Sequence, residues 1–185
     1  MEVMKINKKK VLYYVICAIA SAVSLYYIVN ARVFREIQRD VGLIEDKYKG
    51  MSFEQAVKKV NTWEDCEEYV MSHLRFDASQ PTYDPEKAHN TGKAVCFGAA
   101  NLSKELLSDN KDGYECRLYA FERKDGKVWH VINVVKDKRT GKYGSLGIHS
   151  ADCIFPGYTS KEKLLNRIQR SYFWEETARI EPEEL

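Results

Sequence analysis

The 185-residue sequence predicts an α+β protein in which helices come first and an antiparallel sheet follows. Apolar residues recur at helical spacing in the first half of residues 51–185. From Tyr114 to Ile148 they lie instead in short strand-like runs, which are separated by turn residues. A third observation concerns the N-terminus, where residues 11–29 carry no charge and predict one transmembrane helix before the folded domain.

The uncharged stretch at residues 11–29 is long enough to cross a bilayer core as a helix. Residues 1–10 form a basic tail, whereas the arginines after the stretch are diluted by acidic residues. By the positive-inside rule, we expect a cytoplasmic tail, a single-pass signal-anchor in the membrane and an extracytoplasmic domain. A cleaved signal peptide is the alternative, since Ala18-Ile19-Ala20 and Ala20-Ser21-Ala22 resemble cleavage sites. The apolar run continues beyond both sites and therefore favours an uncleaved anchor.

Helices are expected over most of the chain between this anchor and residue 107. Residues 30–50 predict a membrane-proximal helix that ends at a glycine, and residues 51–185 form the domain that follows. Two short helices, at residues 52–60 and 62–74, open with capping boxes. The paired residues of the boxes are Ser52 with Gln55 and Thr62 with Asp65. Residues 77–93 contain prolines and glycine and predict an irregular loop, and a further helix runs from Cys96 to about Leu107.

Strands dominate the second half of the domain. The pattern predicts strands at residues 116–123, 128–136 and 142–148, joined by turns that contain glycine. A last helix is expected to start at a cap formed by Thr159 with Glu162 and to reach about Ala178.

Cys96 and His130 are the residues that point most directly to chemistry. Cys96 stands at the start of a predicted helix, and His130 lies on a later predicted strand. A thiol reacts as its thiolate, and both a helix N-terminus and a nearby imidazolium favour that form. This pairing is what a cysteine nucleophile requires, so the sequence predicts an enzyme.

The residues around this pair resemble the transglutaminase-like superfamily of cysteine enzymes, whose core has a papain-like α+β fold. The resemblance covers residues 91–156, although Trp129 precedes the histidine where many members place a tryptophan two residues after it. It rests on three runs in the family's order, which are Cys96-Phe97-Gly98-Ala99-Ala100, Gly113-Tyr114-Glu115-Cys116-Arg117 and Trp129-His130-Val131-Ile132-Asn133-Val134. The resemblance implies a papain/transglutaminase-like core and thioester chemistry at amide bonds.

The third catalytic residue is less evident, because Gly147 stands where the family usually has an aspartate. If the hairpin closes through residues 138–141, the register places His149 opposite His130. Asp152 lies just beyond this strand and could fold back to the imidazole. We therefore expect Asp152 to orient the ring and select its tautomer, with His149 as the alternative.

The expected reaction begins with attack of the Cys96 thiolate on an amide carbonyl, after which His130 protonates the leaving amine. The backbone N–H of Cys96 and one further donor would hold the oxyanion. Asn90 is expected as that donor by analogy with papain-like enzymes, which have a glutamine at this spacing. The thioester would pass to water, in a peptidase or deamidase, or to an amine, in a cross-linking enzyme. We expect a peptidase whose partner is a protein or peptide substrate.

Two other functions stay open. An NlpC/P60-type cell-wall peptidase would give His149 the third catalytic role, although the Asp-Cys-Ser-Gly start usual in that class is absent. A non-catalytic membrane-anchored domain on the same fold would bind protein or glycan instead.

Composition argues against several other classes. The net charge is +2 and no basic run is interleaved with aromatic residues, so no nucleic-acid partner is expected. There is no Cys-x-x-Cys or His-x-x-x-His pair, and we expect neither a metal nor another cofactor. If Cys96 is a free nucleophile, Cys66, Cys116 and Cys153 leave room for at most one disulfide.

Overall fold

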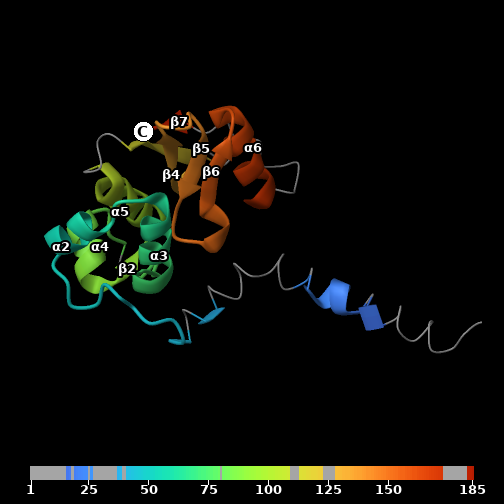
Figure 1. Ribbon diagram of the computed structural model, residues 1–185. Helices are drawn as coiled ribbons and strands as arrows, with labels where there is room; N and C mark the ends of the chain where they lie inside the picture. The colour runs from blue at the N-terminus through green and yellow to red at the C-terminus, as the bar shows by residue number, and fades with distance from the viewer. Residues whose placement is uncertain are drawn as a thin grey trace, which may run out of the picture.

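The computed structural model describes residues 16–17, 19–24, 26, 37–38, 41–79, 81–108, 113–122, 128–172 and 183–185. The protein is α+β, with a group of helices followed by an antiparallel sheet (Figure 1). Its elements from residue 53 onward are α2 (Phe53–Lys59), α3 (Trp63–His73), β1 (Arg75–Phe76), α4 (Pro85–Thr91), β2 (Lys93–Ala94), α5 (Cys96–Ser108), β3 (Tyr114–Glu122), β4 (Val128–Asp137), β5 (Tyr143–Leu146), the 3₁₀ helix η1 (Ser150–Asp152), β6 (Ile154–Tyr158), α6 (Lys161–Tyr172) and β7 (Glu183–Glu184).

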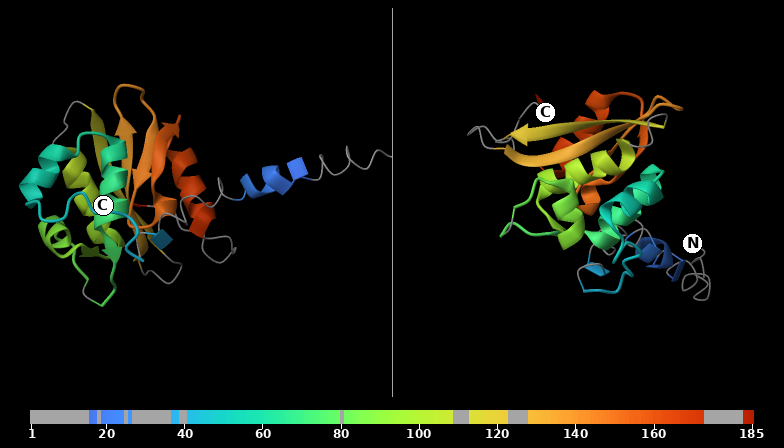
Figure 2. Two further views of the ribbon diagram at one scale, coloured as in Figure 1. Left: turned by 60° about the horizontal axis from the view of Figure 1, so that its bottom comes forward. Right: turned by 90° about the vertical axis from the view of Figure 1, so that its left-hand side faces the viewer.

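The main sheet has the strand order β6-β5-β4-β3-β7, with every neighbouring pair antiparallel. A second, small sheet pairs β1 with β2 in parallel. Helix α5 covers one face of the main sheet and α6 covers the other, as the left view of Figure 2 shows. Apolar residues of both helices are fully buried against the strands, which is the layered arrangement that an α+β domain needs to enclose a core.

The β4–β5 hairpin has the predicted register. Asn133 pairs with Leu146 and Lys136 pairs with Tyr143, as closure through residues 138–141 requires. The strand ends at Leu146, however, so His149 lies beyond the ladder and does not pair with His130 in it.

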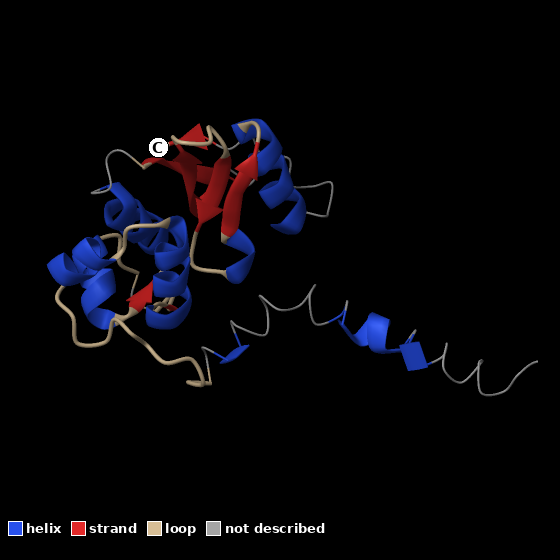
Figure 3. Cartoon of the chain, in the orientation of Figure 1, coloured by secondary structure: helices blue, strands red, loops and turns tan. Residues whose placement is uncertain are grey.

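The expected capping boxes are present at both short helices. Ser52 and Gln55 cap α2, and Thr62 and Asp65 cap α3. The prediction of an irregular loop at residues 77–93 is wrong in its second half, where α4 lies (Figure 3). This helix has three start and stop signals that explain it, which are Asp84 as N-cap, Pro85 in the first turn and Gly92 with φ 65° at the end.

Strand β6 was not predicted, because Pro156 and Gly157 lie inside it. A proline has no N–H to give to a ladder, but an edge strand tolerates it, and β6 is at the edge of the sheet. Helix α6 starts close to the predicted position, and its predicted end near Ala178 lies outside the described residues.

The prediction of an N-terminal transmembrane helix needs correction. Of residues 11–29, the structure describes 16–17, 19–24 and 26, all of them helical. Across the described part of the chain, no helix combines the length and the apolar character that crossing a bilayer requires. The predicted single-pass membrane localisation, with the domain outside the cytoplasm, depended on this helix and is corrected with it.

The predicted helix at residues 30–50 is wrong at its C-terminal end, where residues 41–50 form turns and bends. Residues 37–38 are helical, while residues 30–36, 39–40 and the basic tail at 1–10 lie outside the described residues.

Candidate active site

Cys96 is the first residue of α5, one residue after the end of the short parallel strand β2. Small residues let the backbone pack closely around this helix start. A Cβ atom on Gly98 would lie 2.2 Å from the carbonyl oxygen of Thr82, so only glycine fits there. The thiol is half-buried and packs beside Ala120 and Val131 of the sheet.

His130 lies on β4 beyond the point where β5 ends, so the loop after β5 can fold against its ring. The ring is 3% exposed, and its Nε2 atom is 2.8 Å from Oδ1 of Asp152. Asp152 is itself fully buried. A buried carboxylate next to a buried imidazole is stable only because the two share a hydrogen bond and opposite charges.

The Asp152 carboxylate is held by its own loop. It belongs to η1, and its Oδ2 accepts a hydrogen bond from the backbone N–H of His149 at 3.1 Å. The hydroxyl of Ser145 on β5 donates to the carbonyl oxygen of Asp152. The backbone N–H of His149 therefore orients the carboxylate toward His130, and the Ser145 hydroxyl holds the backbone of Asp152.

Gly147 explains why the aspartate comes from the turn and not from the strand. A Cβ atom at Gly147 would lie 2.6 Å from Oδ2 and 2.7 Å from Cβ of Asp152. Gly147 has no side chain, and the carboxylate of Asp152 fills the space that a side chain there would take. This close approach requires glycine.

Electrostatics favour an ionised pair of Cys96 and His130. Burial raises the pKa of the Cys96 thiol, but the hydrogen bond and charge of His130 and the N–H groups of Val131 and Phe97 outweigh it, so that pKa is lowered. Burial lowers the pKa of His130, yet the charge and hydrogen bond of Asp152, followed by those of Cys96, raise it to about 9. The lowered pKa of the thiol and the raised pKa of the imidazole both favour the thiolate and the imidazolium together below about pH 9.

The two ring nitrogens of His130 have separate partners. Nε2 bonds Asp152, so Nδ1 is the nitrogen left for the hydrogen bond with the thiol. This arrangement can activate a nucleophile and then supply a proton to a leaving group without rotation of the ring.

His149 lies beside the pair but does not take the place of the acid. Its ring centroid is 6.1 Å from that of His130 and 5.5 Å from that of Phe76, which is half exposed. Asp152 occupies the Nε2 position that the third residue would need. His149 therefore supports the site through its backbone N–H and lines it with its ring.

Asn90 lies exposed in the last turn of α4. It lines a surface hollow together with residues that include His73 and His89, and neither Cys96 nor His130 is part of that hollow. The prediction of Asn90 as an oxyanion donor gains no support from this placement.

Sequence reasoning missed the backbone donors at the thiol, which are the N–H groups of Phe97 and Val131. Phe97 could have been found, because the first N–H groups of a helix have no carbonyl partner within it. Val131 could not, since its approach to Cys96 depends on how α5 packs on the sheet.

The other cysteines differ from Cys96 in their surroundings. None of the five cysteines forms a disulfide. Burial raises the pKa of Cys66 well above its usual value and that of Cys116 to about 11. Among the described residues, no group of three metal-ligating side chains is placed to hold an ion.

No protein-family model matches this sequence, and a search of curated proteins found no match either.

Proposed function

We propose that this protein is a transglutaminase-like cysteine enzyme that hydrolyses amide bonds of a protein or peptide substrate through a thioester. The observation that carries this proposal is the chain of contacts from the Cys96 thiol to His130 and from its Nε2 atom to the buried Asp152. A nucleophile, a base and a residue that orients the base are thereby in contact in the order that thiol catalysis uses.

In the first step, the Cys96 thiolate attacks the carbonyl carbon of the amide and forms a C–S bond. The negative oxygen is met by the backbone N–H of Cys96 at the start of α5, where the helix dipole adds to the stabilisation. His130 gives its proton to the amine nitrogen as the C–N bond breaks, which leaves a thioester on Cys96.

In the second step, a water molecule attacks the thioester. His130, which is now neutral, accepts a proton from the water, and the C–S bond breaks to release a carboxylic acid and restore the thiolate. Asp152 stays ionised in both steps, because its task is to hold Nε2 protonated and the ring in place.

The placement of the acid favours this class over the NlpC/P60 type. That alternative would give the third role to His149, whose ring lies 6.1 Å from the His130 ring between centroids. The buried Asp152–His130 pair also speaks against a purely binding function. Two buried ionisable groups with a lowered thiol pKa beside them are typical of catalytic sites.

Alkylation by iodoacetamide at pH 6, followed by peptide mapping, tests the proposal. A pKa of about 11 leaves on the order of 10⁻⁵ of the Cys116 thiol ionised at this pH, so Cys116 is an internal control. We expect Cys96 to be alkylated well before Cys116 and the rate at Cys96 to fall in His130→Ala. Equally slow alkylation of all the cysteines of the folded wild-type chain would contradict the proposal.

A further inference from the structure

The side of β3 that faces away from β4 is covered by the short edge strand β7. On one side β3 pairs with β4 along its length. On the other side, within the described part of the chain, β7 pairs only Tyr119 with Glu184 and Ala120 with Glu183. The backbone N–H of Leu185 adds one hydrogen bond to the carbonyl oxygen of Leu118. Among the described residues, β7 and Leu185 pair with Leu118, Tyr119 and Ala120 on this side of β3, and a strand side of this kind can pair with a partner segment.

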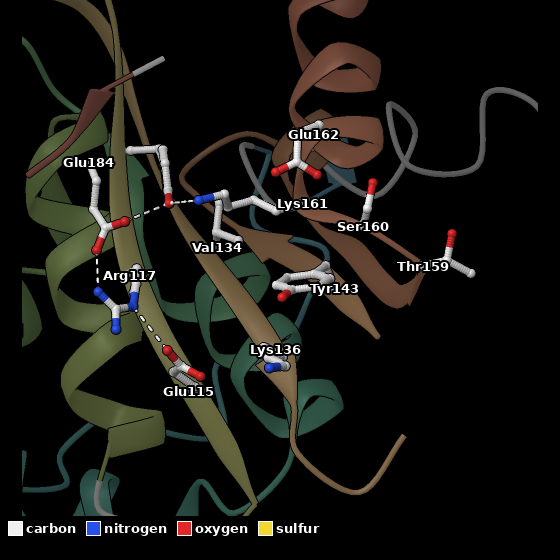
Figure 4. A pocket seen from close by; sticks show the side chains of 11 residues that line it. Glu115, Arg117, Val134, Lys136, Tyr143, Thr159, Ser160, Lys161, Glu162 and Glu184 are labelled. Carbon is white, nitrogen blue, oxygen red and sulfur yellow. Dashed lines mark hydrogen bonds and ion pairs between the residues drawn. The ribbon is translucent and has the colours of Figure 1, made fainter. Parts of the chain in front are cut away.

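Side chains at this edge recognise one carboxylate. Oε2 of Glu184 accepts a hydrogen bond from the Tyr119 hydroxyl at 2.7 Å, and Oε1 is ion-paired with Nη1 of Arg117 (Figure 4). The Lys161 ammonium donates in turn to the Tyr119 hydroxyl at 2.7 Å and lies 5.0 Å from the centre of its ring. Glu184 therefore contacts the Arg117 guanidinium and the Tyr119 hydroxyl directly, and the Lys161 ammonium reaches it only through that hydroxyl. Arg117 is also ion-paired with Glu115 at 3.0 Å.

The carboxylate lies at one end of a wider hollow between the sheet and the start of α6 (Figure 4). The hollow has a volume of about 350 Å³. Lys136 adds a third cation to its lining and lies over the ring of Tyr143, at 5.6 Å from the ring centre. The hollow extends beyond Glu184 and has room for further side chains of a bound segment.

We propose that this edge of β3, with the hollow beside it, is a docking site for an extended acidic segment of a partner protein. The segment pairs with β3 in the place of β7 and puts a glutamate where Glu184 lies. The chain's own residues 183–185 show the mode of binding, since they already combine a strand pairing with one partly buried contact of a carboxylate. Backbone pairing supplies affinity in this kind of recognition, and the side-chain site supplies specificity. The proposal concerns binding and does not depend on the reaction proposed for Cys96.

The intramolecular segment is held weakly enough to be exchanged. It pairs over two residues only, and Leu185 is 59% exposed. The Arg117 and Glu184 side chains are 55% and 39% exposed, so water and salt screen their ion pair. Because the segment is tethered, its effective concentration at the edge is on the order of millimolar. A partner segment must compete with it, and removal of the Glu184 carboxylate should relieve that competition.

A labelled synthetic peptide tests the proposal with the full-length chain. The probe is fluorescein-labelled Ile180-Glu181-Pro182-Glu183-Glu184-Leu185, and binding is measured by fluorescence anisotropy. We expect Glu184→Ala to bind the probe about fivefold more tightly than the wild-type chain does. Adding Arg117→Ala to that variant should weaken binding of the probe about fivefold. The Glu184→Ala variant should bind a probe with glutamine in the place of Glu184 as weakly as the double variant binds the original probe.

Arg139→Ala in the Glu184→Ala background is the matched control, because Arg139 is an exposed arginine on the β4–β5 turn. It should leave the affinity unchanged. Failure of Glu184→Ala to bind the probe at millimolar concentration would overturn the proposal. An affinity for the probe that is unchanged by Arg117→Ala would overturn it as well. A wild-type chain that forms a concentration-dependent dimer, lost in Arg117→Ala, would assign the edge to a second copy of this chain and would also overturn it.

Discussion

Gly147→Ala tests the most unusual feature of the site, which is an acid that occupies the space of a missing side chain. The new Cβ atom would lie 2.6 Å from Oδ2 and 2.8 Å from Cγ of Asp152. Carbon and oxygen atoms that are not bonded prefer about 3.5 Å or more. The Asp152 carboxylate must therefore move by about 1 Å or the turn must open.

A shift of this size is enough to break the contact with His130. The present Nε2 to Oδ1 distance is 2.8 Å, and an added ångström takes it beyond hydrogen-bond range. Without Asp152, the pKa of His130 loses the charge and hydrogen bond that do most to offset burial and therefore falls, which weakens the cationic partner of the Cys96 thiolate. We expect a loss of turnover of about 10²-fold or more from the displaced base. Overpacking should also cost about 1–3 kcal/mol of the free energy of unfolding.

The assay is the rate of Cys96 alkylation at pH 6, combined with urea unfolding of the same variant. Gly157→Ala is the matched control, since a Cβ atom there meets only the Phe155 carbonyl oxygen at 3.6 Å, an ordinary contact. The control should keep the wild-type alkylation rate, while Gly147→Ala should lose most of it. A folded Gly147→Ala variant that is alkylated as fast as the wild-type chain would refute the reasoning.

Three further predictions follow from the site and the fold. Turnover should have a bell-shaped pH profile. It should rise at a pH below the ordinary thiol pKa, as Cys96 ionises, and fall near pH 9, as His130 loses its proton. Turnover that still rises above pH 10 would contradict the assignment of this pair. Asp152→Asn should lower turnover by about 10²–10⁴-fold and His149→Ala by less than tenfold, and the reverse order in steady-state kinetics would give the third role to His149. His73→Leu should lower the free energy of unfolding by about 1–3 kcal/mol in urea titrations, because the His73 ring is hydrogen-bonded to a carboxylate at 2.8 Å and to a backbone carbonyl at 2.7 Å. An unchanged urea midpoint would show that these hydrogen bonds do not contribute to stability.

Local sequence signals were sufficient for most of the elements. Capping boxes at Ser52 and Thr62 located α2 and α3, because a cap acts within one helical turn. The turn at residues 138–141 set the β4–β5 register, because turn length and side-chain alternation leave few alternatives. Helix α4 carries equally local signals at Asp84 and Gly92, and the prediction failed there because prolines were interpreted as loop markers only.

The site was predictable only in part. Cys96 and His130 could be paired from the sequence, because each lies on an element with a clear local pattern. The approach of Asp152 to His130 depends on where β5 ends and on the space left by Gly147, and neither follows from local propensity. The N–H of Val131 reaches the thiol through packing between α5 and β4, which no spacing rule gives. The transmembrane prediction at residues 11–29 rested on hydropathy alone, and the described residues contain no helix that could span a bilayer.

The most direct test of the central claim is detection of the acyl-enzyme. The full-length chain is incubated with a protein digest, quenched in acid, and the Cys96 peptide is analysed by mass spectrometry with and without neutral hydroxylamine. We expect a hydroxylamine-sensitive acyl adduct on Cys96 that is absent in Cys96→Ala and strongly reduced in His130→Ala. A folded wild-type chain that acquires no such adduct on Cys96, or acquires it equally without His130, would contradict the proposed thioester mechanism.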